Sequence, residues 1–341
     1  MRRGKSQEQG QDGTDPEEGT EEQEGQTQAQ EVIQMAELKL IYEGTDITEY
    51  VDIMECVYRD TSGKECDCLN MKVDHAEKWM RWGPRKNDTI QAKRGGYDTK
   101  ALYLNTITLE DGAYRIYATS VRSGMFAKKW QAYQNATLGN IMDVCASELG
   151  MGAACFGIDA GLKYEYMMRR NQTALAFLDQ LGRLEGAVIK AVNGKITAIG
   201  IEYAQAIKAM HTIELSIDQA DSAYTDRRDK ALGSLRVDTP YGRAVARAKG
   251  TDGLEEGMTD LAVDDDAQAH RWAKGLLLAH NRACETLRIM SEFNPGYTAL
   301  ARVDIESASN AAGQWIIDDV EHDMVENTSR IKLLRCITNI A

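Results

Sequence analysis

The stretch that decides the fold is NQTALAFLDQLGRLEGAVIKAVNGKITAIG, residues 171–200. Its first half predicts a helix that begins after Thr173, because the threonine hydroxyl can accept a hydrogen bond from the free backbone N–H groups of a first turn. The helix is expected to end at Gly186, where a left-handed residue is needed. The apolar side chains recur at helical spacing and share one face: Ala174, Phe177, Leu178, Leu181 and Leu184. We interpret this face as part of a hydrophobic core.

A hairpin is expected directly after this helix. Ala187–Val192 and Lys195–Gly200 are short β-type runs that flank Asn193-Gly194. The Asn-Gly dipeptide favours a type I′ turn, because both central residues of that turn need a positive φ.

A second helix and strand are expected before residue 171. Thr137 precedes an apolar series at helical spacing that stops at Gly150, and Lys163–Met168 has the pattern of a strand. Residues 128–203 are therefore predicted to form a small α+β module.

The region before this module, residues 32–127, reads as short antiparallel strands. Asp111-Gly112 is a second strong hairpin signal and joins Ala101–Glu110 to Ala113–Val121. Ser62-Gly63 separates two further strands, Val51–Arg59 and Cys66–Asp74. Such a pattern is typical of a β-barrel or a β-sandwich.

The region after the module, residues 204–341, is predicted to be a second β-rich domain that carries one long helix. The helix is expected over residues 266–292, with an apolar stripe from Ala269 to Met290. Asp252–Asp266 is acidic and is interpreted as an exposed loop. The expected strands are Thr212–Ile217, Gly233–Asp238, Arg243–Lys249, Thr298–Ile305, Gln314–Glu321 and Ser329–Ile337. The fold class is thus α+β and rich in β-structure.

The first residues differ in composition from the rest of the chain. Residues 1–31 form an acidic, low-complexity arm, which alone cannot bury enough apolar surface to offset its ordering entropy. Two interpretations stay open for this arm: a solubilising tail or cloning remnant, and an acidic segment that a partner orders.

Charge and composition limit the classes of function. The net charge of −13 over 341 residues argues against a protein that grips nucleic acid by its phosphates. No run approaches the roughly 20 apolar residues needed to cross a bilayer, and no signal-peptide core is present. Seven cysteines without a CxxC pair fit reduced thiols, and hence synthesis in the cytosol.

We assign no catalytic, cofactor-binding or metal-binding residue from the sequence. His270 after Asp264-Asp265-Asp266 could suggest a metal site, but acidic residues at a helix start are explained by the helix dipole. Cys66-Asp67-Cys68 lacks a second ligand pair, and Gly150-Met151-Gly152 follows a helix where a dinucleotide loop must follow a strand. His280 is interpreted as a core histidine.

Acidic and basic side chains are plentiful, but the sequence does not pair them. A glycosidase needs two carboxylates about 5–10 Å apart, and nothing in the sequence selects two of the acids. The acids considered are Glu148, Asp159, Glu165, Asp179 and Glu185. The basic doublets Lys128-Lys129, Arg169-Arg170 and Arg227-Arg228 are interpreted as solvated surface, with subunit contacts as the alternative.

Several phrases, in order, do carry a resemblance. Around the module they are Trp130, Asn135–Ile141, Leu149-Gly150-Met151, Asn171-Gln172-Thr173, Ala176-Phe177-Leu178, Leu181, Glu185-Gly186 and Asn193–Ile196. Elsewhere they are Asp67, Leu69, Trp82, Pro84, Lys86, Asp88, Ile116–Ser120, Gly313–Ile316, Val320, His322, Thr328 and Leu333. Together these phrases resemble the late control protein D family, the baseplate hub proteins of contractile phage tails, which are related to type VI secretion spike hubs. The resemblance spans about residues 36–338.

The chain departs from the family pattern at two places. Gln172-Thr173-Ala174 stands where the family often has an acidic residue and Ser-Asp, and Asn87 stands where glycine is usual. Both are turn or cap positions, so the departures question local contacts more than the fold.

The resemblance implies an architectural function without catalytic residues or cofactors. Family hubs resemble trimeric rings in which each chain supplies two tail-tube-like barrels, so that a six-fold tube can meet a three-fold spike. The implied partners are two further copies of the chain, a spike protein, a tail tube or tube-initiator protein and a tape measure protein. A baseplate wedge or LysM-type protein is a further implied partner. The expected location is the baseplate of a virion or tail-like particle that is assembled in the host bacterial cytoplasm.

Two rival functions and two expectations remain at this point. The rivals are a peptidoglycan-degrading tail enzyme and a hub or adaptor of a type VI-like secretion system. Because the chain ends soon after Ile337, we expect the spike to be a separate polypeptide. Acidic residues in a ring lumen would repel DNA phosphates, so we expect passage of DNA without specific binding.

Overall fold

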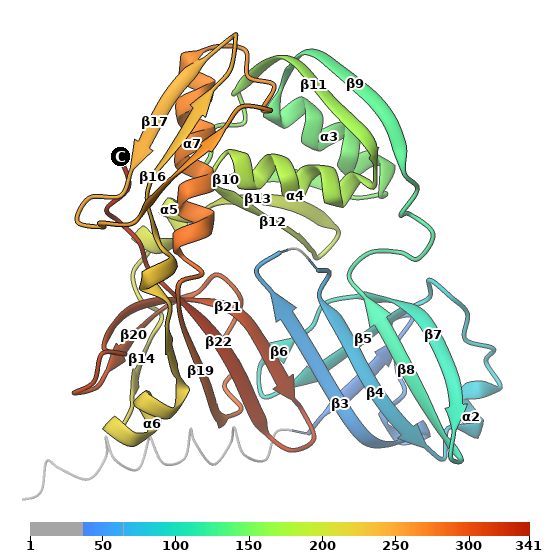
Figure 1. The fold of residues 1–341 in the computed structure, drawn as a ribbon. Helices are drawn as coiled ribbons and strands as arrows, with labels where there is room; N and C mark the ends of the chain where they lie inside the picture. Colours follow the sequence, from blue (N-terminus) through green and yellow to red (C-terminus); the bar gives the residue numbers. More distant parts are fainter. Residues whose placement is uncertain (1–36, 64) are drawn as a thin grey trace, which may run out of the picture. The chain divides into compact units, whose positions relative to one another are not determined.

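The computed structural model describes residues 37–341 apart from residue 64 (Figure 1). The acidic arm expected over residues 1–31 lies outside these residues. Within the described part, β-strands dominate and most of their pairings are antiparallel. The prediction of an α+β fold rich in β-structure is confirmed.

The largest element is a sheet of 14 strands. Its strands before the module are β1 Lys39–Tyr42, β2 Thr45–Asp46, β3 Asp52–Thr61, β4 Cys68–Asp74, β5 Thr89–Arg94, β6 Tyr97–Asp98, β7 Leu102–Glu110 and β8 Ala113–Thr119. Its strands after the module are β14 His211–Glu214, β15 Tyr224–Asp226, β19 Glu285–Glu292, β20 Arg302–Glu306, β21 Gly313–Asp323 and β22 Thr328–Arg335. The main path runs β15-β19-β22-β21-β3-β4-β8-β7-β5-β1-β2.

The two β-rich regions meet inside this sheet. Strand β21 pairs antiparallel with β3, so Glu321 lies opposite Arg59 (red beside blue in Figure 1). The expected pair of closed barrels is therefore corrected, because no closed barrel is found among the described strands. Each of these two strands would otherwise leave an edge of unpaired backbone N–H and C=O groups, which a barrel removes by closing. Here the pairing of β3 with β21 satisfies those groups instead.

The middle of the chain forms the predicted helices and hairpin. Helix α3 spans Leu138–Glu148 and α4 spans Ala174–Leu184. The hydroxyl of Thr173 accepts a hydrogen bond from the backbone N–H of Ala176 at 3.2 Å, as a capping residue should. Asn193 and Gly194 have φ of 50° and 69°, which confirms the type of turn expected between the two strands.

The strands of this region form two small sheets. The parallel pair β10 Gly152–Phe156 and β13 Lys195–Gly200 is extended by β12 Ala187–Val192. A two-stranded ribbon pairs β9 Lys129–Thr137 with β11 Lys163–Gln172. The sequence indicated β11, but it gave no separate signal for β9.

The long helix is shorter than predicted. Helix α7 spans Asp266–Asn281, and the chain continues as strand β19, in which Leu287 lies opposite Leu333 of β22. Met290 fits the helical spacing in sequence, yet its side chain is 68% exposed. Pairing with β22 outweighs the helical pattern here, because strand propensity depends on tertiary context.

A third small sheet packs against α7. It consists of β16 Leu232–Asp238, β17 Arg243–Arg247 and β18 Leu254–Met258 in the order β17-β16-β18. Strand β18 corrects the prediction that residues 252–266 form only a loop. The short helices are η1 Thr48–Tyr50, α2 Glu77–Met80, α5 Ile201–Ala206, α6 Ile217–Ala223 and η2 Arg228–Lys230.

The hydrophobic core is divided into three clusters. One unites α3, α4 and their strands with α7 and β16, and includes Phe177 and Trp272. A second lies under β1–β8 around Trp79, and a third under β19–β22 around Trp315. Phe177 is 2% exposed, which confirms the core face read from residues 171–200.

Candidate functional site

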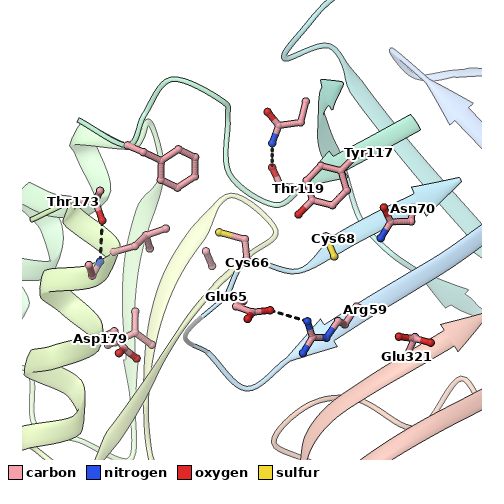
Figure 2. A pocket seen from close by; sticks show the side chains of 16 residues that line it. Arg59, Glu65, Cys66, Cys68, Asn70, Tyr117, Thr119, Thr173, Asp179 and Glu321 are labelled. Atoms are coloured by element: carbon pink, nitrogen blue, oxygen red, sulfur yellow. Dashed lines mark hydrogen bonds and ion pairs between the residues drawn. The ribbon is translucent and has the colours of Figure 1, made fainter. Parts of the chain in front are cut away.

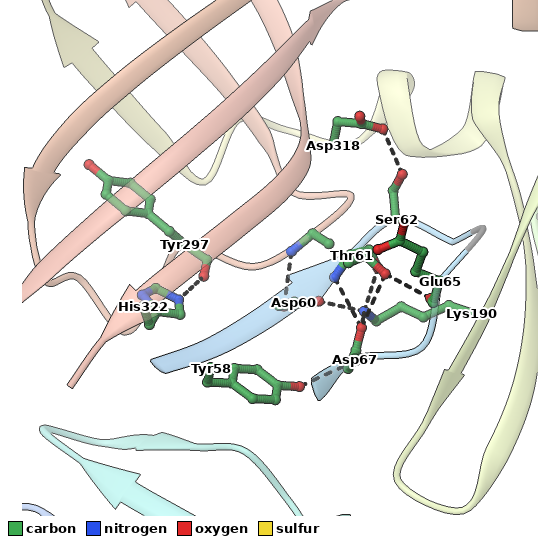
Figure 3. A network of polar contacts seen from close by, with 11 residues as sticks. Tyr58, Asp60, Thr61, Ser62, Glu65, Asp67, Lys190, Tyr297, Asp318 and His322 are labelled. Atoms are coloured by element: carbon green, nitrogen blue, oxygen red, sulfur yellow. Dashed lines mark hydrogen bonds and ion pairs between the residues drawn. The ribbon is translucent and has the colours of Figure 1, made fainter. Parts of the chain in front are cut away.

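A buried ion cluster joins strand β12 to the connection between β3 and β4 (Figure 3). Lys190 lies in the middle of β12, and its ammonium group donates to the carboxylates of Asp60 and Asp67. The Nζ–Oδ1 distance to Asp67 is 2.8 Å, and a further bond of 2.6 Å reaches the backbone oxygen of Thr61. The side chains of Lys190, Asp60 and Asp67 are 11%, 7% and 1% exposed, so they form one desolvated group.

Asp67 is the centre of this cluster. Its carboxylate also accepts hydrogen bonds from the backbone N–H of Thr61 at 3.0 Å and from the hydroxyl of Tyr58 at 3.3 Å. Burial raises the pKa of Asp67 to about 6. The positive charge of Lys190 opposes this rise, and the negative charge of Asp60 adds to it. Two carboxylates share one ammonium, so the cluster carries one negative charge more than it can pair.

A second set of polar contacts fixes the same connection from the other side. The hydroxyl of Ser62 donates to Oδ1 of Asp318 in β21, and its backbone N–H donates to the backbone oxygen of Asp318, each at 2.8 Å. Lys332 of β22 donates to the other carboxylate oxygen at 2.7 Å. Burial alone would raise the pKa of Asp318, but the bonds from Lys332 and Ser62 hold it below its usual value.

The backbone comes close at the same place. A Cβ on Gly63 would lie 2.7 Å from the backbone oxygen of Ile189, so only glycine fits between the β3–β4 connection and β12. The arrangement positions the α4–β12 unit on the large sheet. The three ionisable groups of the Lys190 cluster are buried, so the arrangement suits a structural joint better than a reaction centre.

An open cleft of about 790 Å³ lies next to this joint (Figure 2). The sheet contributes polar side chains such as Arg59, Asn70 and Tyr117, and the α4–β12 unit contributes Leu175 and Ile189. Such a mixed lining of polar and apolar groups is typical of a contact surface.

The acids of the cleft do not form a free pair. Glu65 accepts from Arg59 at 2.7 Å, and Glu321 accepts from Arg330 at 2.7 Å. Asp179 of α4, one of the acids considered from the sequence, also lines the cleft. Carboxylates held in ion pairs are poorly suited to general acid catalysis, which needs a raised pKa.

The cysteines of Cys66-Asp67-Cys68 line the same cleft (Figure 2). Cys68 is 9% exposed and Cys66 is half-buried. Burial raises the pKa of the Cys66 thiol to about 11, which keeps it protonated and unreactive. The residue of this motif that matters for the joint is Asp67 between them, for which the sequence pattern does not predict the buried partner.

The three acids near His270 each accept a hydrogen bond from a different backbone N–H group. Asp265 caps α7 by accepting from Gln268 at 2.7 Å, Asp264 accepts from Glu165, and Asp266 accepts from Arg243. They therefore serve as caps and tethers, as the dipole argument predicts. Residues 37–341 without residue 64 contain no group of three His, Cys, Asp or Glu side chains that could hold a metal ion.

Two interpretations of single side chains were wrong. His280 is exposed and bonds the backbone oxygen of Lys230 at 3.0 Å, so it is not a core histidine. The interpretation of the doublet Arg169-Arg170 as solvated surface holds for the exposed Arg170 but not for Arg169, which is 0% exposed. Its guanidinium donates at 2.8 Å to Glu148, one of the acids considered as catalytic.

Two of the remaining acids considered from the sequence, Glu185 and Asp159, also have structural partners. Glu185 accepts from the indole of Trp272 at 2.7 Å and from the hydroxyl of Tyr164 at 3.1 Å. Asp159 accepts from the backbone of Gly161 within a turn. Glu165 lies exposed on β11. They occur at separate places in the fold.

One pair has the geometry of a nucleophile and a base. His322 Nδ1 lies 2.9 Å from Ser329 Oγ, and His322 Nε2 lies 2.9 Å from the backbone oxygen of Tyr297. Both side chains are 0% exposed, and burial lowers the pKa of His322. With no access to a substrate, this pair fixes β21 to β22.

Solved structures similar to this fold include tail proteins and a component of a type VI secretion system. A tail protein from Neisseria meningitidis has a TM-score of 0.67 and 9% identity, over 88% of this chain and 96% of that one. A 43 kDa tail protein of prophage MuSo2 from Shewanella oneidensis has a TM-score of 0.64 and 10% identity, over 88% and 98%. An E. coli component of the type VI secretion system has a TM-score of 0.51 and 10% identity, over 85% and 75%.

These similarities confirm the resemblance inferred from the sequence at the level of the fold. No protein-family model and no curated protein sequence matches the chain. In the part of the chain that the structure describes, no helix is long and apolar enough to span a membrane.

Proposed function

We propose that this chain is a structural hub of the baseplate of a contractile phage tail or tail-like particle. The observation that carries the proposal is the fold, which matches phage tail proteins over nearly their whole length: 96% and 98% of two of them. The similarity extends through the large sheet and the α+β region, because it covers 88% of this chain. A fold can host several functions, so the proposal needs the tests given below.

In this proposal three copies form a ring between a six-fold tail tube and a three-fold spike. The two β-rich regions, residues 32–127 and 204–341, take the place of two tube-like units in each subunit. The α+β module, residues 128–203, braces them. The joint around Lys190 supports this role, because it ties β12 of the module to β3 of the sheet by buried ionic bonds.

The partners follow from the position of a hub. They are the spike protein, the tail tube or tube-initiator protein, the tape measure protein, and a baseplate wedge or LysM-type protein. The location is the baseplate of the particle, after assembly in the bacterial cytoplasm. The open cleft and the uncovered polar face of the sheet offer surfaces for such contacts.

A structural role is also favoured by the state of the ionisable groups. The carboxylates discussed above are caps, tethers or members of ion pairs. We therefore propose that wall-degrading activity belongs to another subunit.

A hub of a type VI-like secretion system is a second candidate. It is favoured by the similarity to the E. coli secretion component, which covers 85% of this chain. The neighbouring genes distinguish the two candidates, because tube, sheath and tape measure genes indicate a phage tail.

Deletion of the gene in the organism that makes the particle tests the proposed function. We expect tube and sheath proteins to be made while complete tails are absent in electron micrographs, and an intact gene to restore them. Normal tails without this protein would contradict the proposal.

A further inference from the structure

Arg282 is a buried cation with few partners. It follows the last residue of α7 and its side chain is 10% exposed. A guanidinium group has five N–H donors, and buried donors normally have partners. Across residues 37–341 without residue 64, the only interaction described for this guanidinium is an ion pair with Asp318 at 3.9 Å.

Arg169 shows how this chain satisfies a buried arginine elsewhere. Its guanidinium donates to Gln172 O at 2.7 Å, to Ala127 O at 2.9 Å and twice to Glu148, at 2.8 and 3.2 Å. Arg282 makes no comparable set of bonds. Burial also lowers the pKa of Arg282, as expected where desolvation exceeds the compensation by Asp318. The contrast points to an acceptor that the described residues do not supply.

Arg282 lines a cavity of about 150 Å³ where several parts of the fold meet. Arg183 comes from the last turn of α4 and Lys332 from β22. Ser62 adds a hydroxyl from the β3–β4 connection and Asp318 a carboxylate from β21. Since one water occupies about 30 Å³ of liquid, the cavity has room for a small ion with its hydration.

The charges that line this cavity favour an anion. Three cations, Arg183, Arg282 and Lys332, face two carboxylates, Asp179 and Asp318, which leaves one positive charge in excess. Asp318 already accepts from Lys332 at 2.7 Å and from Ser62 at 2.8 Å. The negative charge of Asp318 therefore compensates mainly the positive charge of Lys332. The positive charge of Arg282 is compensated less, because its distance to Asp318 is 3.9 Å.

We propose that this cavity binds a small oxyanion, of the phosphate or carboxylate class, through the guanidinium groups of Arg282 and Arg183. Planar guanidinium groups bind such anions by paired, charge-assisted hydrogen bonds. The bound anion would link α4 and α7 to β21 and β22, because residues of all four line the site. It would thus stabilise the folded chain by mass action. The inference does not depend on the proposed function.

Thermal unfolding of the full-length protein at neutral pH tests the site. Sodium phosphate and sodium acetate are titrated separately against sodium chloride at equal ionic strength. A saturable rise in Tm with phosphate or with acetate supports the site, and the stronger of the two identifies the anion. No rise beyond that in chloride with either anion would overturn the proposal.

Two matched variants locate the effect. Arg183→Gln removes an exposed cation that lines the cavity, whereas Arg330→Gln removes an exposed cation of the same sheet region that does not line it. We expect Arg183→Gln to weaken the apparent anion affinity about tenfold, the effect of losing one charge-assisted bond, and Arg330→Gln to leave it unchanged. Equal responses of both variants would show general screening and overturn the site. Arg282→Gln should abolish the response, and should this variant not fold, Arg183→Gln decides.

Discussion

At the residue scale, Lys190 is the side chain on which the joint depends. Lys190→Met should remove the ammonium that Asp60 and Asp67 share, leaving two buried carboxylates without their cation. We expect a loss of about 3–5 kcal/mol in the free energy of unfolding, measured by urea denaturation at neutral pH. Lys274→Met is the control, because its ion pair with Glu202 has side chains 33% and 59% exposed and should contribute less than about 1 kcal/mol. Equal losses in the two variants would contradict the view that Lys190 holds a buried, stabilising ion cluster together.

Asp67 should give the protein a distinctive dependence on pH. Its pKa is raised from 3.8 to about 6, so the folded state binds this proton more tightly than the unfolded state. The resulting stabilisation is complete below pH 3.8 and is lost as the pH rises through about 6. The stability of the wild type relative to Asp67→Asn should therefore fall by up to about 3 kcal/mol between pH 4 and pH 7.

Urea denaturation of both proteins across this pH range measures the effect. Groups far from the cluster titrate in both proteins, so their contributions cancel in the difference. A difference that stays flat with pH would show that Asp67 is not held in a desolvated cluster.

The cluster could be predicted only in fragments. A lysine inside the apolar run AVIKAV is unusual in a buried strand, and an acid between the two small residues Cys66 and Cys68 directly precedes strand β4. Each is a signal that a buried partner exists. Which residue is the partner depends on contacts between positions 123 apart in the chain, and no local pattern encodes them.

At the scale of elements, α4 is held by its apolar face. Phe177 stacks on Tyr133 of β9 with ring centroids 5.5 Å apart and an angle of 3° between the planes. Phe177→Ala should empty this position and lower the free energy of unfolding by about 3–5 kcal/mol. Val144→Ala on α3, at a side chain 44% exposed, is the control and should cost far less. Chemical denaturation compares them, and equal costs would show that Phe177 is not a core residue.

The contact between α4 and α7 depends on a glycine. A Cβ on Gly275 would lie 2.2 Å from the backbone oxygen of Leu184, so the two helices can approach only without a side chain there. Gly275→Ala should therefore destabilise the protein by about 1–3 kcal/mol. Gly257→Ala in β18, where no atom lies within 4 Å of the added Cβ, should be nearly neutral. Thermal unfolding of both variants checks the pair, and a neutral Gly275→Ala would refute the close approach.

Local signals were sufficient for some elements and insufficient for others. Capping by Thr173 and the Asn193-Gly194 turn are decided within a few residues, so the sequence predicts them well. Asn87 is also explained locally. Its φ is 74°, at a position where the resembled family usually has glycine, and asparagine tolerates that conformation. Strand β19 could not be predicted, because its register with β22 comes from pairing across 40 or so residues.

At the scale of the whole molecule, one sheet joins the two β-rich regions. The sequence predicts the regions separately, but it does not predict that β3 pairs with β21, whose paired residues Arg59 and Glu321 are far apart in the chain. The ion pair of Arg59 with Asp319 strengthens this contact. A chain that joins its halves so firmly should behave as one cooperative unit in assembly.

The mass of the purified protein in solution tests the central claim most directly. Light scattering is measured on the protein alone and after addition of the spike protein encoded near it. The account predicts a trimer, or a monomer that becomes trimeric when the spike is added, since a three-fold spike requires three copies. A monomer that stays monomeric and ignores the spike would contradict the assignment as a hub.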